Sequence, residues 1–274
     1  MSGYKNFAVV GAGEIGSFII RQLLTDKAAG TVNDVVVLTR QGSKTSVDPA
    51  AKLIPVDYSD KESIKTALTG VDVVISTVAL TALNLQPGIA EAAKEVGVKL
   101  FVPSEFGGPT VGPKGGSLSM KASVQEQLKA IGIPYALFWT GPFADFIWVD
   151  TSGLDVLSGK VFVGGDGSNP IPFTSRLDIA RYLSYVLTHL PADQLKNRSF
   201  SIRGDTKEYE AKTGKRVEVT YIPVSELDAR LASNPQDVVA SLQKIWATPY
   251  HPETDNHLYP DWNPSSVVDN IPLA

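Results

Sequence analysis

The apolar positions in the first half of the chain form short continuous runs separated by stretches with helical spacing. The runs predict strands at residues 7–10, 35–38, 52–56, 71–75, 99–102 and 134–139. Alternating strands and helices require a parallel sheet with right-handed crossovers. Because the runs are continuous, the strands should be buried on both faces. We therefore predict an α/β fold with a doubly wound parallel sheet over residues 1–150.

The pattern loosens beyond residue 150. Arg176 to His189 reads as an amphipathic helix whose apolar stripe includes Leu177, Ala180 and Leu183. Further elements are expected at residues 217–222, 225–231 and 236–246. We predict that residues 151–274 form a smaller lobe that packs on the first domain, covers its cleft and selects the substrate.

A glycine motif, G-x-G-x-x-G, follows the first predicted strand and opens a helix. Its first glycine can make the tight turn, the second lets backbone amides approach a diphosphate, and the third lets the helix pack closely on the sheet. We predict a Rossmann-type dinucleotide site formed by Gly11, Gly13, Glu14, Ile15 and Gly16. The Glu14 carboxylate must then point away from the bound anion, and a glycine-rich turn without a ligand is the alternative.

The second strand ends at Arg40 and is followed by Lys44, with no acidic residue nearby. An acid at this place would hold the ribose hydroxyl of NAD, whereas a basic residue accommodates the 2′-phosphate of NADP. We therefore predict NADP(H), against the alternative of an ordinary solvated loop. Asp57 and Tyr58 are placed to meet the adenine, although Asp57 fits local turn chemistry equally well. An S-x-x-E capping box, 59–62, should open the next helix.

Residues after the fifth and sixth strands should face the same cleft, because ligands bind at the carboxyl ends of parallel strands. We assign these to the substrate side: Glu105, Thr140, Gly141, Pro142, Phe143 and Phe146. Phe143 and Phe146, with Trp148, would form an aromatic wall for a planar substrate, and ordinary core packing explains them equally well. The glycine- and proline-rich stretch 107–117 fits a loop over the cleft.

Lys121 is the candidate catalytic residue. It falls in the first turn of the helix predicted after that loop and shares a face with Val124 and Leu128, so it should point inward. Burial would lower its pKa toward a range useful for proton transfer. The alternative is a surface lysine whose stem lies along the protein.

Other chemistries find little support in the sequence. No tyrosine has a lysine four residues later, so the Tyr-x-x-x-Lys pair of short-chain dehydrogenases is missing, which also weakens a sugar-nucleotide epimerase. The chain has neither cysteine nor a G-x-S-x-G motif. His251, Glu253, Asp255 and His257 lie in a proline-rich stretch without metal-site spacing, so we predict no metal.

Charge and hydropathy limit the classes of partner that the protein could bind. A net charge of −4 without a basic run argues against nucleic acid. No apolar run reaches membrane-spanning length, and the first strand begins too early for a signal peptide. We expect a soluble, cytoplasmic protein without a membrane partner, and a homodimer is one assembly that the sequence permits.

Several motifs together resemble the NmrA-like family, and more narrowly the isoflavone reductase and phenylcoumaran benzylic ether reductase branch of atypical short-chain dehydrogenases, in its fungal form. They are GAGEIG at 11–16, VISTV at 74–78, FVPSEFG at 101–107, MKASV at 120–124 and GIPYALFWTGPFADF at 132–146. The resemblance covers roughly the first 150 residues in order and spacing, and the remainder more weakly.

The resemblance implies an NADPH-dependent reductase of small aromatic, phenylpropanoid-like compounds. Hydride would go to a benzylic, enone or carbonyl carbon, and Lys121 occupies the position of the family's catalytic lysine. The family also suggests cofactor contacts: Arg40 and Lys44 at the 2′-phosphate, Thr77 and Val78 along the cofactor, and Pro103, Ser104 and Phe106 near the nicotinamide. A non-catalytic, NADP(H)-binding, redox-sensing regulator is the alternative function.

Two departures from the family pattern concern the substrate. The segment 204–211, before the KTGK turn at 212–215, is shorter than in typical members, which suggests a reshaped substrate lobe. The loop before Lys121 is short and glycine-rich, so substrate contacts of the plant enzymes do not transfer to this chain.

Overall fold

The computed structural model describes residues 3–43, 47–110, 117–146, 158–169, 171, 173–204, 218–247 and 253–266. Its centre is a five-stranded sheet in the order β3-β2-β1-β4-β5, in which all neighbouring strands are parallel. The strands are β1 (Asn6–Val10), β2 (Asp34–Arg40), β3 (Lys52–Val56), β4 (Val73–Ser76) and β5 (Leu100–Val102). The predicted fold class, a doubly wound parallel sheet, is confirmed.

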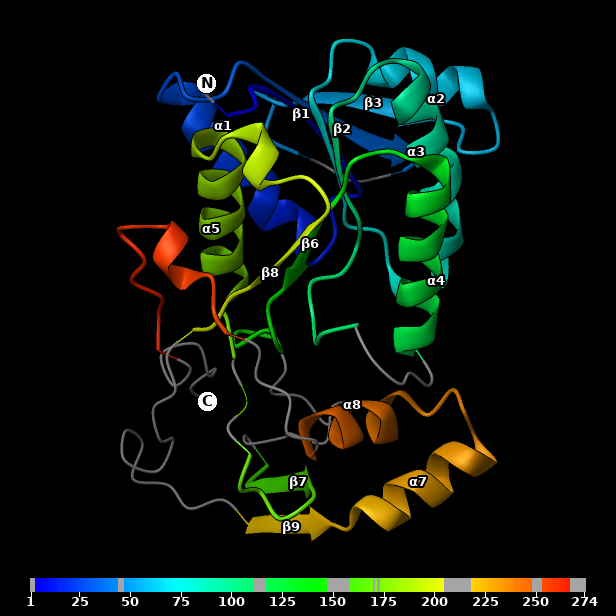
Figure 1. Cartoon of the computed structure of the whole chain (residues 1–274), viewed down its shortest axis with the longest axis vertical. Coiled ribbons are helices and arrows are strands. Elements are labelled where there is room, and N and C mark those ends of the chain that lie inside the picture. The colour runs from blue at the N-terminus through cyan, green and yellow to red at the C-terminus, as the bar shows by residue number, and fades with distance from the viewer. Residues whose placement is uncertain are drawn as a thin grey trace.

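Helices cover both faces of this sheet (Figure 1). One face carries α1 (Gly16–Ala28) and α5 (Arg176–His189), which contact each other. The other carries α2 (Lys61–Leu68), α3 (Gln86–Glu95) and α4 (Ser117–Ile131). A 3-10 helix, η1 (Leu80–Leu85), leads from β4 into α3 and was not expected from the sequence.

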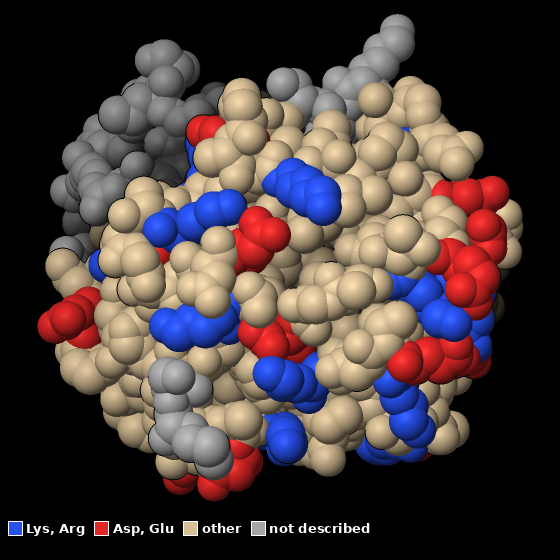
Figure 2. Space-filling view, turned by 90° about the horizontal axis from the view of Figure 1, so that it is seen from above, with Lys and Arg blue, Asp and Glu red and all other residues tan. Residues whose placement is uncertain are grey.

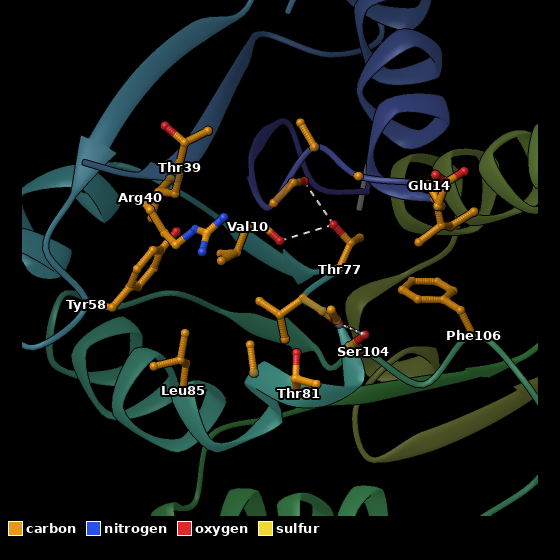
Figure 3. Close-up of a pocket in the computed structure, with 18 of the residues that line it drawn as sticks. Val10, Glu14, Thr39, Arg40, Tyr58, Thr77, Thr81, Leu85, Ser104 and Phe106 are labelled. Carbon is orange, nitrogen blue, oxygen red and sulfur yellow. Dashed lines mark hydrogen bonds between the residues drawn. The ribbon is translucent and has the colours of Figure 1, made fainter. Parts of the chain in front are cut away.

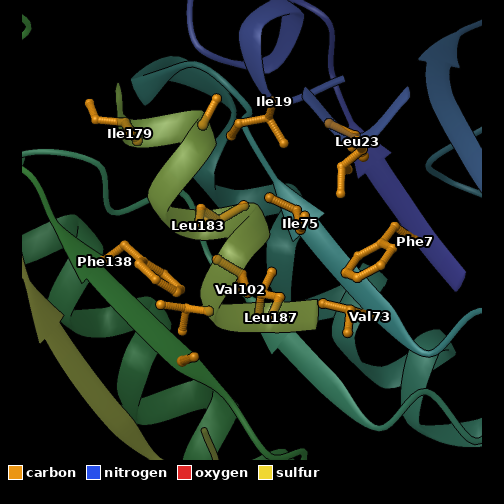
Figure 4. Packing of buried hydrophobic residues seen from close by; sticks show 14 of the residues in the cluster. Phe7, Ile19, Leu23, Val73, Ile75, Val102, Phe138, Ile179, Leu183 and Leu187 are labelled. Atoms are coloured by element: carbon orange, nitrogen blue, oxygen red, sulfur yellow. The ribbon is translucent and has the colours of Figure 1, made fainter. Parts of the chain in front are cut away.

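The strands bury side chains on both faces, as their continuous apolar runs predict. Phe7 and Val9 of β1 pack into the core on the α1 and α5 side (Figure 4), whereas Ala8 and Val10 pack against α2 and α3. Because alternate residues of a strand point to opposite faces, one run of apolar residues serves two cores.

The sixth predicted strand, β6 (Ala136–Trp139), does not extend the five-stranded ladder. It pairs in parallel with β8 (Arg198–Ser201), and an isolated bridge from Tyr135 to Phe101 links it to β5. The Phe138 ring stacks on Phe200 with centroids 5.0 Å apart, an aromatic contact that favours this pairing.

The prediction for the apolar stripe of α5 was wrong at Leu177, which is 53% exposed. The buried stripe runs through Ile179, Leu183 and Val186 toward α1. Leu177 lies about 200° round the helix from Ile179, so it points away from the sheet.

The remaining elements lie below this body in Figure 1. They are the parallel pair β7 (Lys160–Gly164) and β9 (Glu218–Ile222), followed by α7 (Val224–Ser233) and α8 (Val238–Ala247). Two 3-10 turns, η3 (Ala192–Gln194) and η4 (Asn256–Leu258), complete the described elements. The domain boundary expected near residue 150 falls outside the described residues, so that division stays a prediction.

The expected capping box at the start of α2 was wrong. The cap is Asp60, whose Oδ1 accepts a hydrogen bond from the Glu62 amide at 3.0 Å. Ser59 is occupied elsewhere: its Oγ donates to Asp57 Oδ1 at 2.6 Å. The Glu62 amide that the capping box would have bonded to Ser59 therefore bonds to Asp60 instead.

The face seen in Figure 2 carries Lys and Arg side chains interspersed with Asp and Glu. Such mixing gives no extended single-sign field on this face. Among the described residues, no helix combines the length and the hydropathy needed to cross a membrane.

Candidate functional site

A cleft of about 670 Å³ opens at the carboxyl ends of β1, β2 and β4. This volume lies in the range of roughly 300–1,000 Å³ typical of ligand sites. Its lining comprises Val10, Gly11, Ala12, Gly13, Glu14, Ile15, Leu38, Thr39, Arg40, Ser43, Tyr58, Thr77, Val78, Ala79, Thr81, Ala82, Leu85, Ser104, Glu105, Phe106, Lys121 and Phe143. The topology thus brings Gly11, Arg40, Thr77 and Glu105 together at this edge of the sheet, whereas Thr140, which was expected at the same edge, is not among the lining residues.

The glycine turn has the geometry of an anion site. Gly11 has a φ of +94°, a backbone angle that residues with a side chain rarely adopt. A Cβ at Gly16 would overlap the Gly11 carbonyl and the Thr77 hydroxyl, whereas one at Gly13 would meet no atom within 4 Å. Gly13 lines the cleft just before α1 and has open space where a side chain would stand. Amide N–H groups at the start of a helix favour a phosphate.

The hydroxyl groups of Thr77 and Ser104 donate hydrogen bonds to backbone carbonyls of the cleft wall. The Thr77 Oγ1 donates to the carbonyls of Val10 at 3.1 Å and Gly11 at 2.9 Å. The Ser104 Oγ donates to the Val78 carbonyl at 2.8 Å and so ties the end of β5 to the end of β4. Figure 3 shows these bonds across the centre of the site. Both predicted cofactor residues line the cleft and also hold its backbone in place.

Glu14 lines the rim of the cleft, and in Figure 3 its side chain points away from Arg40 and the centre of the site. Its carboxylate forms an ion pair with the guanidinium of Arg176, the first residue of α5. The same guanidinium donates from Nε to Asp145 Oδ2 at 2.9 Å. The sequence predicted that Glu14 would point away from a bound anion, and in the structure its carboxylate pairs with Arg176.

Arg40 lies at the far end of the cleft, where β2 ends, next to Tyr58. Burial raises the pKa of Tyr58 to about 12, with the Arg40 charge opposing this rise. Asp57 does not line the cleft, and its hydrogen bonds from Ser59 lower the pKa of its carboxyl group. Lys44 lies outside the described residues.

Lys121 lies in α4 just beyond the first turn, slightly further into the helix than expected, and its side chain lines the cleft. Val124 and Leu128 on the same face are buried, as predicted. The Lys121 amine donates to the backbone carbonyl of Glu105. Burial lowers the pKa of Lys121, and the nearby Glu105 carboxylate opposes this effect. The amine is therefore held in the same cleft as the glycine turn.

The residues assigned to the substrate side divide into two groups. Phe143 and Glu105 line the cleft, although the Glu105 Oε1 accepts a hydrogen bond from Gln125 Nε2 at 2.7 Å. The cleft lining does not include Thr140, Gly141, Pro142 or Phe146. Phe146 is 45% exposed and lies 5.0 Å from the guanidinium of Arg176. Trp148 lies outside the described residues. Pro103, expected near the nicotinamide, is buried and is not among the lining residues.

Sequence reasoning missed one wall of the cleft. This wall is formed by the segment that follows β4 and includes η1: Ala79, Thr81, Ala82 and Leu85. None of these side chains carries a charge, and the segment has no motif. Its position after the carboxyl end of a strand was the one available signal.

Comparison with known proteins identifies the family, because the model of the NmrA-like family matches residues 4–249. The chain belongs to the NmrA-like family. It is 29% identical to phenylcoumaran benzylic ether reductase POP1 of Populus trichocarpa over 87% of this chain and 85% of that protein. It is 26% identical to isoflavone reductase homolog P3 of Arabidopsis thaliana over 97% of each chain.

A solved structure of AtPrR2 with NADP+ and (+)pinoresinol superposes with a TM-score of 0.75 at 24% identity, covering 97% of this chain and 98% of that one. At this identity the likeness supports the fold. The NmrA-like and isoflavone reductase resemblance read from the sequence is thus confirmed at the level of the family.

Proposed function

We propose that this NmrA-like protein is an NADPH-dependent reductase of small aromatic, phenylpropanoid-like compounds. The observation that carries the proposal is the placement of the Lys121 amine in the same cleft as an anion-binding glycine turn and a guanidinium at the end of β2. Relatives named as a benzylic ether reductase and an isoflavone reductase homolog support the same class of reaction.

The residues present fit NADP(H). The open space at Gly13 and the N-terminal end of α1 would take the diphosphate. Arg40, at the end of β2, would pair with the 2′-phosphate, and the half-buried Tyr58 beside it would pack on the adenine. When bound, NADPH would supply a hydride to a benzylic, enone or carbonyl carbon of the substrate.

Lys121 would move the proton. In its charged form the amine can donate a proton to a substrate oxygen, while the Glu105 carbonyl fixes its direction. Phe106 and Phe143 offer apolar rings at this end of the cleft, a surface suited to an aromatic substrate.

The decisive experiment compares the wild type with Lys121→Met in NADPH-oxidation assays on aromatic enones, aldehydes and benzylic ethers. We expect the substitution to lower kcat by about 10²–10⁴-fold, the usual contribution of a positioned acid, while the Kd for NADPH changes little. Equal turnover by both proteins would refute the role of Lys121. Tight NADPH binding without turnover by the wild type would instead favour the non-catalytic regulator.

The pH profile gives an independent check of Lys121. As a donor it must be protonated, so kcat/KM should be level at low pH and fall as the pH rises through its pKa. Because burial lowers this pKa from 10.5, the fall should begin below pH 10.5. A rate that rises with pH through the same range would contradict the assignment of Lys121 as donor.

A further inference from the structure

Arg176 joins three segments that are far apart in the sequence. Its guanidinium pairs with Glu14, in the glycine turn 162 residues away, and with Asp145, in the turn after β6. Its backbone amide also donates to Asp145 Oδ1 at 3.0 Å. The guanidinium carbon lies 4.8 Å from the centroid of the Phe18 ring on α1. The side chain is only 12% exposed, so these contacts leave the guanidinium little freedom.

Glu14 creates an electrostatic problem for a dinucleotide site. It stands between the second and third glycines of the motif and lines the cleft. Its side chain is 64% exposed, so packing alone does not restrain it. A carboxylate swinging toward the start of α1 would compete with a phosphate for the same amide groups and would repel it.

We propose, building on the proposed NADP(H) function, that Arg176 is a positioning residue that holds the Glu14 carboxylate away from the cofactor diphosphate. Arg176 is not among the residues that line the cleft, so it acts through Glu14. The Asp145 carboxylate also holds Arg176, because it accepts hydrogen bonds from the Arg176 backbone amide and from Nε of the guanidinium. The affinity for the diphosphate therefore depends on a residue at the start of α5.

The same guanidinium connects the glycine turn with the turn after β6. Asp145 lies two residues beyond Phe143, and both Phe143 and Glu14 line the cleft. One guanidinium holds both turns. Its loss should therefore affect diphosphate binding before it affects the distant Arg40 end of the site.

The test uses Arg176→Gln, Glu14→Gln and the double variant, each titrated with NADPH and with adenosine 2′-monophosphate. The second ligand carries the 2′-phosphate but no diphosphate, so it reports on the Arg40 end alone.

We expect Arg176→Gln to weaken NADPH binding by about tenfold, the order of effect of one like charge near a partly shielded anion. Binding of adenosine 2′-monophosphate should change by less than about twofold. Adding Glu14→Gln to Arg176→Gln should restore the NADPH affinity to within about threefold of the wild type.

Three results would overturn the inference. They are an unchanged NADPH affinity in Arg176→Gln, an equal loss of both ligands, and a double variant as weak as the single one. The last result would mean that Arg176 attracts the diphosphate directly.

Thermal unfolding of each ligand-free variant verifies folding. If Arg176→Gln does not fold, Arg176→Lys, with and without Glu14→Gln, repeats the comparison. A wild type that binds no NADP(H) would refute the proposed function and this inference with it, whereas normal wild-type binding with unresponsive variants would refute the inference alone.

Discussion

Gly13 and Gly16 belong to one motif, yet the structure gives them different neighbours. A Cβ at Gly16 would run into the Gly11 carbonyl and the Thr77 hydroxyl, so this glycine permits the contact between α1 and the turn. A Cβ at Gly13 would enter open space in the cleft wall. At the scale of single residues, the fold requires Gly16, whereas nothing in the fold requires Gly13, for which we propose a role in binding the ligand.

Substituting each glycine by alanine should separate these roles. We expect Gly16→Ala to lower the free energy of unfolding by about 1–3 kcal/mol, because the added methyl group forces the backbone apart. Gly13→Ala should change that free energy by less than about 0.5 kcal/mol but weaken NADPH binding, since its methyl group occupies the diphosphate space. Urea unfolding and NADPH titration measure both quantities. A Gly13→Ala protein that binds NADPH normally would contradict the assigned diphosphate site.

For helix α5 the predicted bounds were correct, but the prediction of which face is buried was partly wrong. Its bounds agree with the prediction, because its apolar spacing is a local property. Leu177 and Leu183 both looked suitable for the buried stripe, but only Leu183 is buried. Contact with α1 on the same face of the sheet selected the stripe that includes Tyr182 and Val186.

Two leucine substitutions test this orientation. Leu183→Ala should lower the free energy of unfolding by about 2–5 kcal/mol, the cost of a cavity in a packed core. Leu177→Ala, at 53% exposure, should change it by no more than about 0.5 kcal/mol. Urea denaturation of the two variants in parallel gives the comparison, and similar losses for both would mean that α5 is rotated from the position described.

At the scale of the whole molecule, much of the second half of the chain belongs to the same core as the sheet. The core on the α1 side includes residues of α5 and β8, and Tyr259 and Trp262 pack against it. The Trp262 ring meets Tyr182 edge-on with centroids 5.3 Å apart. The Tyr182 hydroxyl donates to the Asp255 carbonyl at 2.7 Å. This part of the chain therefore stabilises the sheet.

Trp262→Ala should separate stability from binding. The loss of a partly buried aromatic ring should lower the free energy of unfolding by about 1–3 kcal/mol, less than the roughly 3–5 kcal/mol of a fully buried one. The Kd for NADPH should stay within about twofold, because Trp262 is not among the cleft-lining residues. Urea unfolding and NADPH titration decide the point, and a large rise in Kd with unchanged stability would contradict the structural role.

Local patterns accounted for most of the predictions that held. Strand runs, the glycine turn, Arg40 at the end of β2 and the inward face of α4 all depend on residues close together in the chain. The failures came where two neighbouring residues could play the same role, as when Asp60 rather than Ser59 accepts the hydrogen bond from the Glu62 amide. They also came where a distant strand supplied the pairing, as β8 does for β6.

The sequence by itself determined that a dinucleotide-type turn follows a buried strand and that a lysine lies on the apolar face of a later helix, because both are short-range properties of spacing. Only the tertiary structure decided which residue restrains Glu14, since Arg176 reaches the glycine turn only after α5 packs beside α1. Ion pairs between segments so far apart leave no periodic trace in the chain. They arise from the packing of the elements, and that packing depends on the whole core.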